Sequence, residues 1–455
     1  MKNSIRIASG QGFWGDLPRA PVDQIRKGPI DYLVMDYLAE VSMSIMQKQK
    51  MKNPDYGYAR DFVAFLKEVL PDIREKKIKI ISNAGGVNPK ACKEAVLDLA
   101  RTGGFNDLNV GVVDGDDLLP ELDRLLENGH PLKNMETGEE MTSIRDRLLN
   151  ANIYFGSRPV VEALTQGSDI VITGRVADPS LTLAPMVYEF GWKYGDHDKI
   201  ASGTVAGHLL ECGAQASGGN FTDWREVERL EEIGFPIVEA YPDGTFYVTK
   251  HENSGGLVNV KTVKEQLVYE IGDPSEFLTP DVTVDFTSVG IEQAGKDRVK
   301  VNRVKGMPAT ADYKVSASFK NGYKLSSTLV YCRPDALFKA KKAGEILQAR
   351  AESMGLKFDR IRIEYIGVNA CNEDPAELEK EHLELNEVQL RVSASGPSKE
   401  DLDRLGKEFA PLILTGPPGV TGYAGGRPKA SEVVAYWPAL LDKKAANPRV
   451  QIYSP

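Results

Sequence analysis

The sequence is poor in cysteine and histidine. Its four cysteines, Cys92, Cys212, Cys332 and Cys371, are widely spaced and form no C-x-x-C pair. This pattern indicates neither a zinc site nor a disulfide framework, so we expect the cysteines to be reduced. Only five histidines occur, and two of them lie between Gly203 and Gly256.

Long apolar runs and basic runs are also missing. No window of about 18 apolar residues occurs, and the N-terminal residues enter a strand-like segment without the apolar core of a signal peptide. We therefore expect a cytoplasmic protein that does not bind membranes. The net charge is -9, and no cluster of Lys or Arg is long enough to bind a phosphate backbone, so nucleic acid is not an expected partner.

The chain is longer than one hydrophobic core usually supports. It has 455 residues, of which 42% are apolar and 27% charged, as is typical of a folded globular protein. We expect two domains in an α/β protein. Residues 1–235 should form a Rossmann-like domain with a mainly parallel sheet, and residues 236–455 an α+β two-layer sandwich of ferredoxin-like type.

Short apolar runs alternate with helical patterns over the first 180 residues, which favours a parallel sheet. The predicted helices cover 58–70, 90–102 and 117–129, and the predicted strands cover 5–9, 32–37, 78–83, 108–113, 153–155 and 170–174. Ligands bind beyond the carboxyl ends of strands in open α/β sheets. We therefore predict a ligand-binding crevice lined by the residues at these ends: Ser9, Gly10, Asp36, Tyr37, Asn83, Gly85, Gly86, Asp114, Gly115, Asp116, Gly174, Arg175, Asp178 and Ser180.

The second half of the chain is rich in alternating β patterns. Asn321-Gly322 between two such runs predicts a hairpin. A helix over 336–354, strands over 360–366 and 387–395 and a helix over 399–409 then indicate the ferredoxin-like sandwich. Exposed strand edges in this domain predict a homo-oligomer.

The first loop offers an alternative function. Gly10-Gln-Gly12-Phe-Trp-Gly15 matches the G-x-G-x-x-G pattern of dinucleotide sites, and Asp36 stands where a ribose-binding acid would lie. Pro18 and Pro21 follow, however, so a helix is not expected to begin at the third glycine and face a pyrophosphate. An NAD(P) oxidoreductase therefore stays an alternative, and a glycine-rich loop shaping another pocket is favoured.

The segment from Gly203 to Asp223 contains the first group of candidate catalytic residues. A helix over 203–215 places His208, Glu211, Cys212 and Gln215 on one face, and Asn220 and Asp223 follow closely. These groups suit acid–base chemistry. The alternatives are that His208 and Gln215 satisfy buried polar groups, or that His208 and Glu211 bind a metal; no third ligand is evident, so no metal is predicted.

A second group begins at Lys250-His251, which follows a predicted strand and precedes Ser254, Gly255 and Gly256. A histidine near neutral pKa can move a proton, and a lysine or backbone amides can stabilise an enolate or thioester oxyanion. The alternative is a glycine turn with a surface Lys and His.

The loop from Leu414 to Pro428 is rich in glycine and proline and includes Tyr423 and Arg427. A loop of this kind often closes a site, and Arg427 beside a Gly-Gly turn is a candidate anion ligand. The alternative is a plain surface connector.

Several long motifs in this order resemble the acyclic terpene utilisation protein AtuA family. The resemblance rests on residues 5–16, 83–89, 173–178, 203–224, 250–251, 265–274, 278–282 and 416–428. It covers the chain nearly end to end. It implies a role in the breakdown of acyclic terpenes through acyl-CoA thioesters, beside biotin-dependent geranyl-CoA carboxylation, with a lyase or hydratase step.

The sequence thus predicts an enzyme that acts on a carboxylate or an acyl-CoA thioester. His251 or His208 would move the proton and Glu211 or Asp223 would orient it. Charge would be held by Arg175, Arg427 and the amides of Gly85, Gly86, Gly255 and Gly256. No cofactor is implied, although CoA can form part of the substrate. The alternative outside enzymes is a non-catalytic subunit or ligand-binding partner of an acyl-CoA carboxylase.

Overall fold

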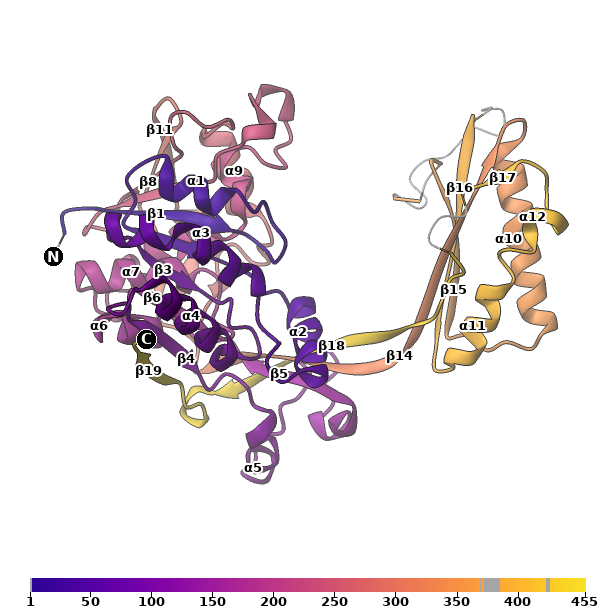
Figure 1. Ribbon diagram of the computed structural model, residues 1–455, viewed down its shortest axis with the longest axis horizontal. Helices are drawn as coiled ribbons and strands as arrows, with labels where there is room; N and C mark the ends of the chain where they lie inside the picture. Colours follow the sequence, from indigo (N-terminus) through magenta and orange to yellow (C-terminus); the bar gives the residue numbers. More distant parts are fainter. Residues whose placement is uncertain (1, 369, 372–384, 423–425) are drawn as a thin grey trace. The chain divides into compact units, whose positions relative to one another are not determined.

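A computed structural model describes residues 2–368, 370–371, 385–422 and 426–455 (Figure 1). The chain forms two compact units, unit 1 with Met1–Ser318 and Tyr436–Pro455, and unit 2 with Phe319–Ala435. The boundary expected near residue 236 differs from this division, because the strands between residues 237 and 302 extend the sheet that starts at residue 5. Within the described ranges, no helix combines the length and apolarity needed to cross a membrane.

Unit 1 is built on a mixed ten-stranded sheet. Its five central strands, β1, β2, β3, β6 and β4, pair in parallel, and the strands on both sides pair antiparallel. The expected parallel sheet thus describes only the centre. In spatial order the strands are β11 (Gly290–Gly295), β12 (Arg298–Asn302), β8 (Phe246–Thr249), β7 (Ile237–Ala240), β1 (Ile5–Gln11), β2 (Tyr32–Met35), β3 (Lys79–Ser82), β6 (Ile170–Thr173), β4 (Val110–Asp114) and β19 (Arg449–Tyr453).

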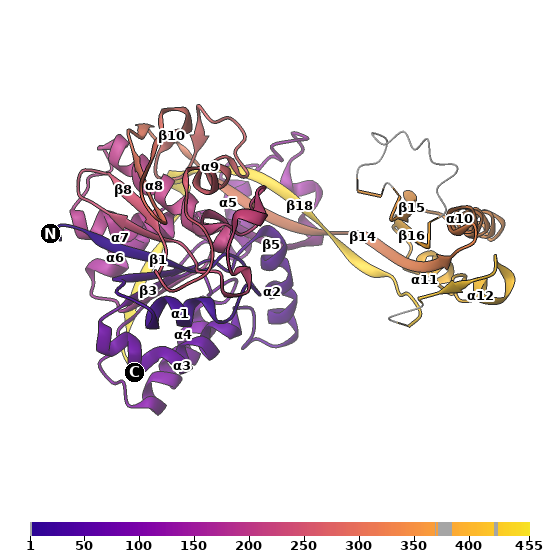
Figure 2. The same cartoon turned by 90° about the horizontal axis from the view of Figure 1, so that it is seen from above.

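Helices cover both faces of this sheet. Figure 2 shows α1 (Ala20–Arg26), α3 (Arg60–Lys76) and α4 (Pro89–Gly103) on one face, and α6 (Arg158–Thr165), α7 (Ser180–Phe190) and α8 (His197–Glu211) on the other. Every residue of β2 and β6 is therefore buried. Strands enclosed in this way are apolar on both sides, which explains their continuous hydrophobic runs.

The helix α3 illustrates how the sequence directs this packing. Its buried residues Phe62, Leu66, Val69 and Ile73 recur every three or four positions, so they form one apolar face against the sheet. The helix ends at Lys77, which adopts a left-handed conformation with φ of 56°. The prediction of a helix from residue 58 is confirmed, although α3 continues beyond the predicted end at Leu70.

The other elements of unit 1 lie around this core. They include the three-stranded sheet β13 (Lys305–Met307), β10 (Thr283–Asp285) and β9 (Phe277–Leu278), and the helices α2 (Glu40–Lys52), α5 (Leu122–Glu127) and α9 (Val260–Val268). The strand predicted at 153–155 is instead β5 (Leu148–Ile153), which pairs with β14 and not with the parallel strands.

Unit 2 has a sheet covered by helices on one face. Leu347 in the first helix and Leu402 in the second pack with Leu390 and Val392 of the sheet. The strand order is β15-β16-β14-β17, and β18 also pairs with β14. In chain order the elements are β14 (Asp312–Cys332), α10 (Ala336–Ser353), β15 (Arg360–Ile366), β16 (Glu387–Gly396), α11 (Lys399–Lys407), α12 (Leu412–Thr415), β17 (Val420–Thr421) and β18 (Ser431–Asp442).

The hairpin predicted at Asn321-Gly322 is wrong. The strand β14 runs through this dipeptide without turning. Its second half, from Tyr323 onward, pairs antiparallel with β16, while in its first half Lys314 accepts a hydrogen bond from the Tyr154 amide beside β5 at 2.9 Å. The two halves pair with different strands, so no turn is needed, although Gly322 keeps a φ of 78°.

Candidate active site

Five buried polar residues follow or end the parallel strands of unit 1. They are Ser9 in β1, Asp36 after β2, Asn83 after β3, Asp116 after β4 and Arg175 after β6. Asn83 holds Asp36 in place. Its Nδ2 donates to Asp36 Oδ1 at 2.6 Å, and its Oδ1 accepts from the backbone N–H of Tyr37 at 2.7 Å. The carboxyl ends of neighbouring parallel strands meet at one sheet edge, where ligands bind in open α/β sheets.

Arg175 braces this edge of the sheet. Its Nη1 donates to the Leu38 carbonyl at 2.7 Å and lies 3.0 Å from Asp178 Oδ1. Its backbone N–H donates to Asp116 Oδ2 at 2.9 Å, and its guanidinium lies 4.0 Å from the centre of the Tyr154 ring. These contacts fix the loop that follows β2, so Arg175 contributes charge to the site from a buried and rigid position.

The helix α8 places a histidine and a glutamate beside these strand ends. It ends at Glu211, earlier than predicted. His208 Nδ1 lies 2.8 Å from Glu211 Oε1, and Nε2 lies 2.9 Å from the carbonyl oxygen of Gln266. With Glu211 ionised, both partners are acceptors and both ring nitrogens donate. His208 is 2% exposed, so it holds Glu211 in place and has no free nitrogen for a substrate.

The charge of His208 follows from these contacts. Burial alone would lower the pKa of His208, but the nearby Glu211 charge and the hydrogen bonds to Glu211 and Gln266 raise it above its ordinary value. A histidine that donates from both nitrogens to a carboxylate and a carbonyl is an imidazolium. The pair therefore consists of a cation and a carboxylate with a fixed orientation.

Glu211 leaves one oxygen unused. Its Oε2 is buried and accepts no hydrogen bond from the described residues, and the same is true of the Ser9 hydroxyl. Buried polar atoms without partners are rare, so each of these two needs an explanation, for which a bound ligand or a catalytic role is suited. Burial raises the pKa of Asp36 to about 6 against the opposing effects of Arg175 and Asn83, and the charge of Glu211 adds to this rise. Two carboxyl groups thus influence each other here.

A chain of amides supports this pair from outside. Gln266 in α9 donates from Nε2 to the His208 carbonyl at 2.8 Å, so the two residues bind each other in both directions. Gln215 donates to Gln266 Oε1 at 3.0 Å, and Asn220 donates to Gln215 Oε1 at 3.1 Å. Gln215 and Asn220, which the sequence suggested as ligand-binding residues, therefore take part in this chain.

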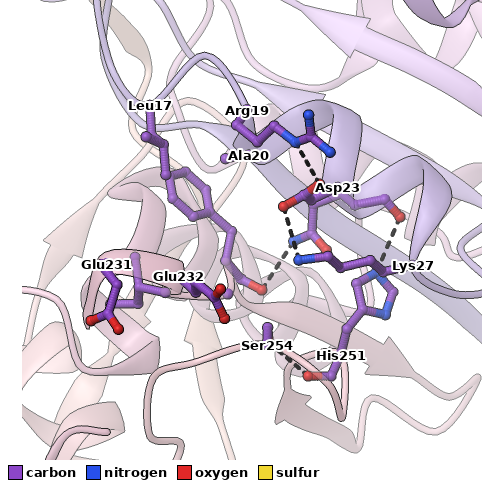
Figure 3. Close-up of a pocket in the computed structure, with 13 residues that line it drawn as sticks. Leu17, Arg19, Ala20, Asp23, Lys27, Glu231, Glu232, His251 and Ser254 are labelled. Atoms are coloured by element: carbon purple, nitrogen blue, oxygen red, sulfur yellow. Dashed lines mark hydrogen bonds and ion pairs between the residues drawn. The ribbon is translucent and has the colours of Figure 1, made fainter. Parts of the chain in front are cut away.

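His251 belongs to a separate group beside a cavity of about 330 Å³. Burial lowers the pKa of His251, and its Nε2 lies 3.1 Å from the Gln24 carbonyl, to which a neutral ring donates. Figure 3 shows Arg19, Asp23 and Lys27 on one side of the cavity and acidic residues across from them. The lining includes Leu17, Arg19, Asp23, Lys27, Glu231, Glu232, Phe235, His251 and Ser254.

Lys250 and Ser254 stabilise the turn around His251. Lys250 Nζ donates to the Ser254 carbonyl at 3.0 Å and lies 3.3 Å from Asp297 Oδ2. The Ser254 hydroxyl donates to the His251 carbonyl at 2.6 Å. Lys250 is buried and paired, so it is not the surface lysine of the alternative prediction, and its contacts give it a structural role in the turn.

Three of the four backbone amides considered as oxyanion donors have protein partners. Gly255 and Gly256 donate to the carbonyl oxygens of Glu232 and Glu228, both at 2.8 Å, and Gly86 donates to a carbonyl three residues earlier at 3.1 Å. An amide that already donates within the protein is not available to a developing oxyanion. These three glycines therefore shape the backbone.

Packing accounts for three other glycines at the strand ends. A Cβ on Gly10 would lie 3.0 Å from a side chain of β2, one on Gly12 would lie 2.5 Å from the Gly213 nitrogen, and one on Gly85 would lie 2.5 Å from the last carbonyl of β6. The first helix after β1 begins only at Ala20. Close packing thus explains the first two glycines of the G-x-G-x-x-G pattern, whereas the third, Gly15, has open space around an added Cβ and a positive φ of 99°.

The contact of Gly12 makes a testable prediction. Gly12→Ala should lower the stability of unit 1 by about 1–3 kcal/mol, because the new methyl group would overlap the backbone after Glu211. All four tryptophans lie in unit 1, so denaturant unfolding followed by tryptophan fluorescence reports on it. Gly195→Ala is the matched control, since nothing lies within 4 Å of its added Cβ. Equal stability of both variants would contradict the packing explanation.

The comparison with protein families returns one match over almost the whole chain. The model described as acyclic terpene utilisation family protein AtuA matches residues 5–452. The chain belongs to the AtuA family. No curated protein and no solved structure matches it.

Three predicted site residues of this AtuA family member are not part of the two groups. Asp223 is at the surface, where Lys261 Nζ lies 2.9 Å from its carboxylate. Arg427 is exposed and belongs to unit 2. Tyr423 lies outside the described residues. Across the described ranges, no three His, Cys, Asp or Glu side chains are grouped to hold a metal ion.

Sequence reasoning gave no site role to Gln266, which shapes the AtuA site, and predicted Asp116 only as one of the strand-end residues. Gln266 is a buried amide on the apolar face of α9, between Val263 and Leu267, and a polar residue in such a stripe is the signal that it has a partner. Asp116 accepts from the Arg175 amide and from Asn152 Nδ2 at 2.8 Å, and burial raises its pKa to about 7. Its position after β4 is what placed it in the predicted crevice.

Proposed function

We propose that this protein is an enzyme that moves a proton next to the carbonyl of a carboxylate or acyl-CoA thioester, in a hydratase or lyase reaction. The observation that carries the proposal is Glu211, with one carboxylate oxygen held by His208 and the other buried without a partner in the described residues. A fixed carboxylate with an unused oxygen is suited to act as a general base.

In the dehydration direction, Glu211 Oε2 takes a proton from the carbon beside the carbonyl. Asp36, whose pKa is raised to about 6 by burial, gives its proton to the leaving hydroxyl group, and water departs as the carbon–carbon double bond forms. Hydration is the reverse of these steps. His208 keeps its proton throughout and balances the charge of Glu211.

The family description supports a substrate from acyclic terpene breakdown, and the CoA thioester is part of this proposal. The proposal also includes a Rossmann-like arrangement of the five central strands. In sheets of this kind, ligands bind beside the carboxyl ends of the strands. The geometry gives no support to the NAD(P) alternative, because packing explains Gly10 and Gly12 and the first helix after β1 begins only at Ala20.

Deuterium exchange tests the proposal. The full chain is incubated in D₂O with a panel of straight and branched enoyl-CoA and 3-hydroxyacyl-CoA thioesters and the free acids, and proton NMR follows the loss of the signal beside the carbonyl. Thermal shift with the same panel, free CoA, NAD and NADP identifies binding. We expect exchange and stabilisation for one thioester or acid class. Binding without exchange would favour the non-catalytic carboxylase partner, and stabilisation by NAD(P) alone would contradict the proposal.

A further inference from the structure

The strand β15 forms an edge of the unit 2 sheet with little to prevent pairing. Its seven residues pair in unbroken register with β16, from Arg360 opposite Ser395 to Ile366 opposite Gln389. It contains no proline, glycine or lysine, and in the part of the chain that the structure describes β16 is its only strand neighbour. A continuous edge of this kind is a template for another strand.

Unit 1 has an edge strand, β11, whose register is irregular. The edge strand β11 has an irregular register between Gln293 and Gly295, and its residues from Glu292 to Gly295 are exposed. A break in register of this kind keeps an edge strand from pairing. The edge strands β11 and β15 are therefore built differently, and of these two only β15 keeps a regular register.

The two faces of β15 have distinct chemistry. Ile361, Ile363 and Tyr365 pack against the core of unit 2. Arg362 and Glu364 alternate onto the other face, where Glu364 accepts from Arg391 of β16 at 2.6 and 2.9 Å and lies 3.1 Å from Arg362 Nε. One face is thus apolar, and the other carries opposite charges two residues apart.

We propose that β15 pairs antiparallel with β15 of a second copy of this chain, about a two-fold axis at Ile363. In this register Arg362 of each copy lies opposite Glu364 of the other, and Ile361 lies opposite Tyr365. Opposite charges and apolar pairs across strands stabilise a sheet, whereas like charges directly opposite destabilise it. An axis at Arg362 or Glu364 would place that residue opposite its own copy, so the charges select the axis at Ile363.

The oligomeric state of the full chain tests the pairing. Sedimentation velocity should show a dimer, and Arg362→Glu should raise its dissociation constant at least about tenfold, because two glutamates would then face each other on both sides of the axis. Glu292→Lys on the exposed β11 edge is the matched control and should leave the dimer unchanged. A monomeric wild type, or a folded Arg362→Glu variant that dimerises normally, would overturn the proposal.

Disulfide formation between introduced cysteines tests the pairing register directly. This test does not depend on the folding of the Arg362→Glu variant. Arg362→Cys and Glu364→Cys are made separately in a Cys371→Ser background, which removes the exposed cysteine. Residues directly opposite in antiparallel strands are within disulfide reach. The mixed proteins should give a covalent dimer on oxidation, and each protein alone should not. No crosslink in the mixture, or equal crosslinks in each protein alone, would refute the axis at Ile363.

Discussion

Turnover should fall at least about 100-fold in the Glu211→Gln variant while unit 1 stays folded. The amide oxygen of glutamine can still accept the hydrogen bond from His208 Nδ1, so the position of the side chain is kept. The amide cannot take a proton as the unpaired carboxylate oxygen does. The measurement is the initial rate of deuterium exchange with the substrate found in the panel, with tryptophan fluorescence as the test of folding.

Two further variants separate the roles of the neighbouring groups. Asp223→Asn should keep normal turnover, because Asp223 pairs with Lys261 at the surface. His208→Gln should lower turnover, because Glu211 Oε1 loses the charged donor that holds it in position. Normal turnover of Glu211→Gln, or a large loss in Asp223→Asn, would refute the assignment of the base.

Stability should fall by about 3–5 kcal/mol in the Asp281→Ala variant. The buried Asp281 carboxylate accepts from the Ser157 amide at 2.8 and 3.0 Å, from the Ser157 hydroxyl at 2.9 Å and from the Ser180 hydroxyl at 2.7 Å. These donors stand at the starts of α6 and α7, so their loss leaves buried groups unsatisfied at two helices. Denaturant unfolding followed by tryptophan fluorescence gives the value.

The matched control for this change is Asp273→Ala. Asp273 is exposed and accepts from the Ser275 amide and hydroxyl in a surface turn, at 2.8 and 2.6 Å. Its loss should change the stability by less than about 1 kcal/mol, because water replaces the missing acceptor. Similar losses in the two variants would show that Asp281 does not join the two helices.

Local patterns predicted the centre of the sheet and one half of the site. The apolar runs before Asp36 and Asn83 identified the strand ends, since buried parallel strands are apolar on both faces. Helical spacing placed His208 and Glu211 together, because residues three apart share a helix face. Both predictions depend only on residues close in sequence.

The half of the candidate site that the sequence did not predict depends on residues far apart along the chain. Gln266 reaches His208 from another helix, 58 positions later, and no periodicity connects the two. The Gly255 amide looked available because its partner, the Glu232 carbonyl, lies in a separate loop. Asn321-Gly322 fits a hairpin locally, but the strands available on either side decided the pairing.

The order of the strands along the chain constrains how the protein can be made. Unit 2 interrupts unit 1, and β19, which pairs with β4 at one edge of the large sheet, lies after the interruption. During synthesis β4 therefore emerges long before its partner and exposes unpaired backbone groups until residues 449–453 leave the ribosome. Folding of unit 1 can be completed only after unit 2 has been synthesised, so an early stop in translation leaves an open, aggregation-prone sheet edge.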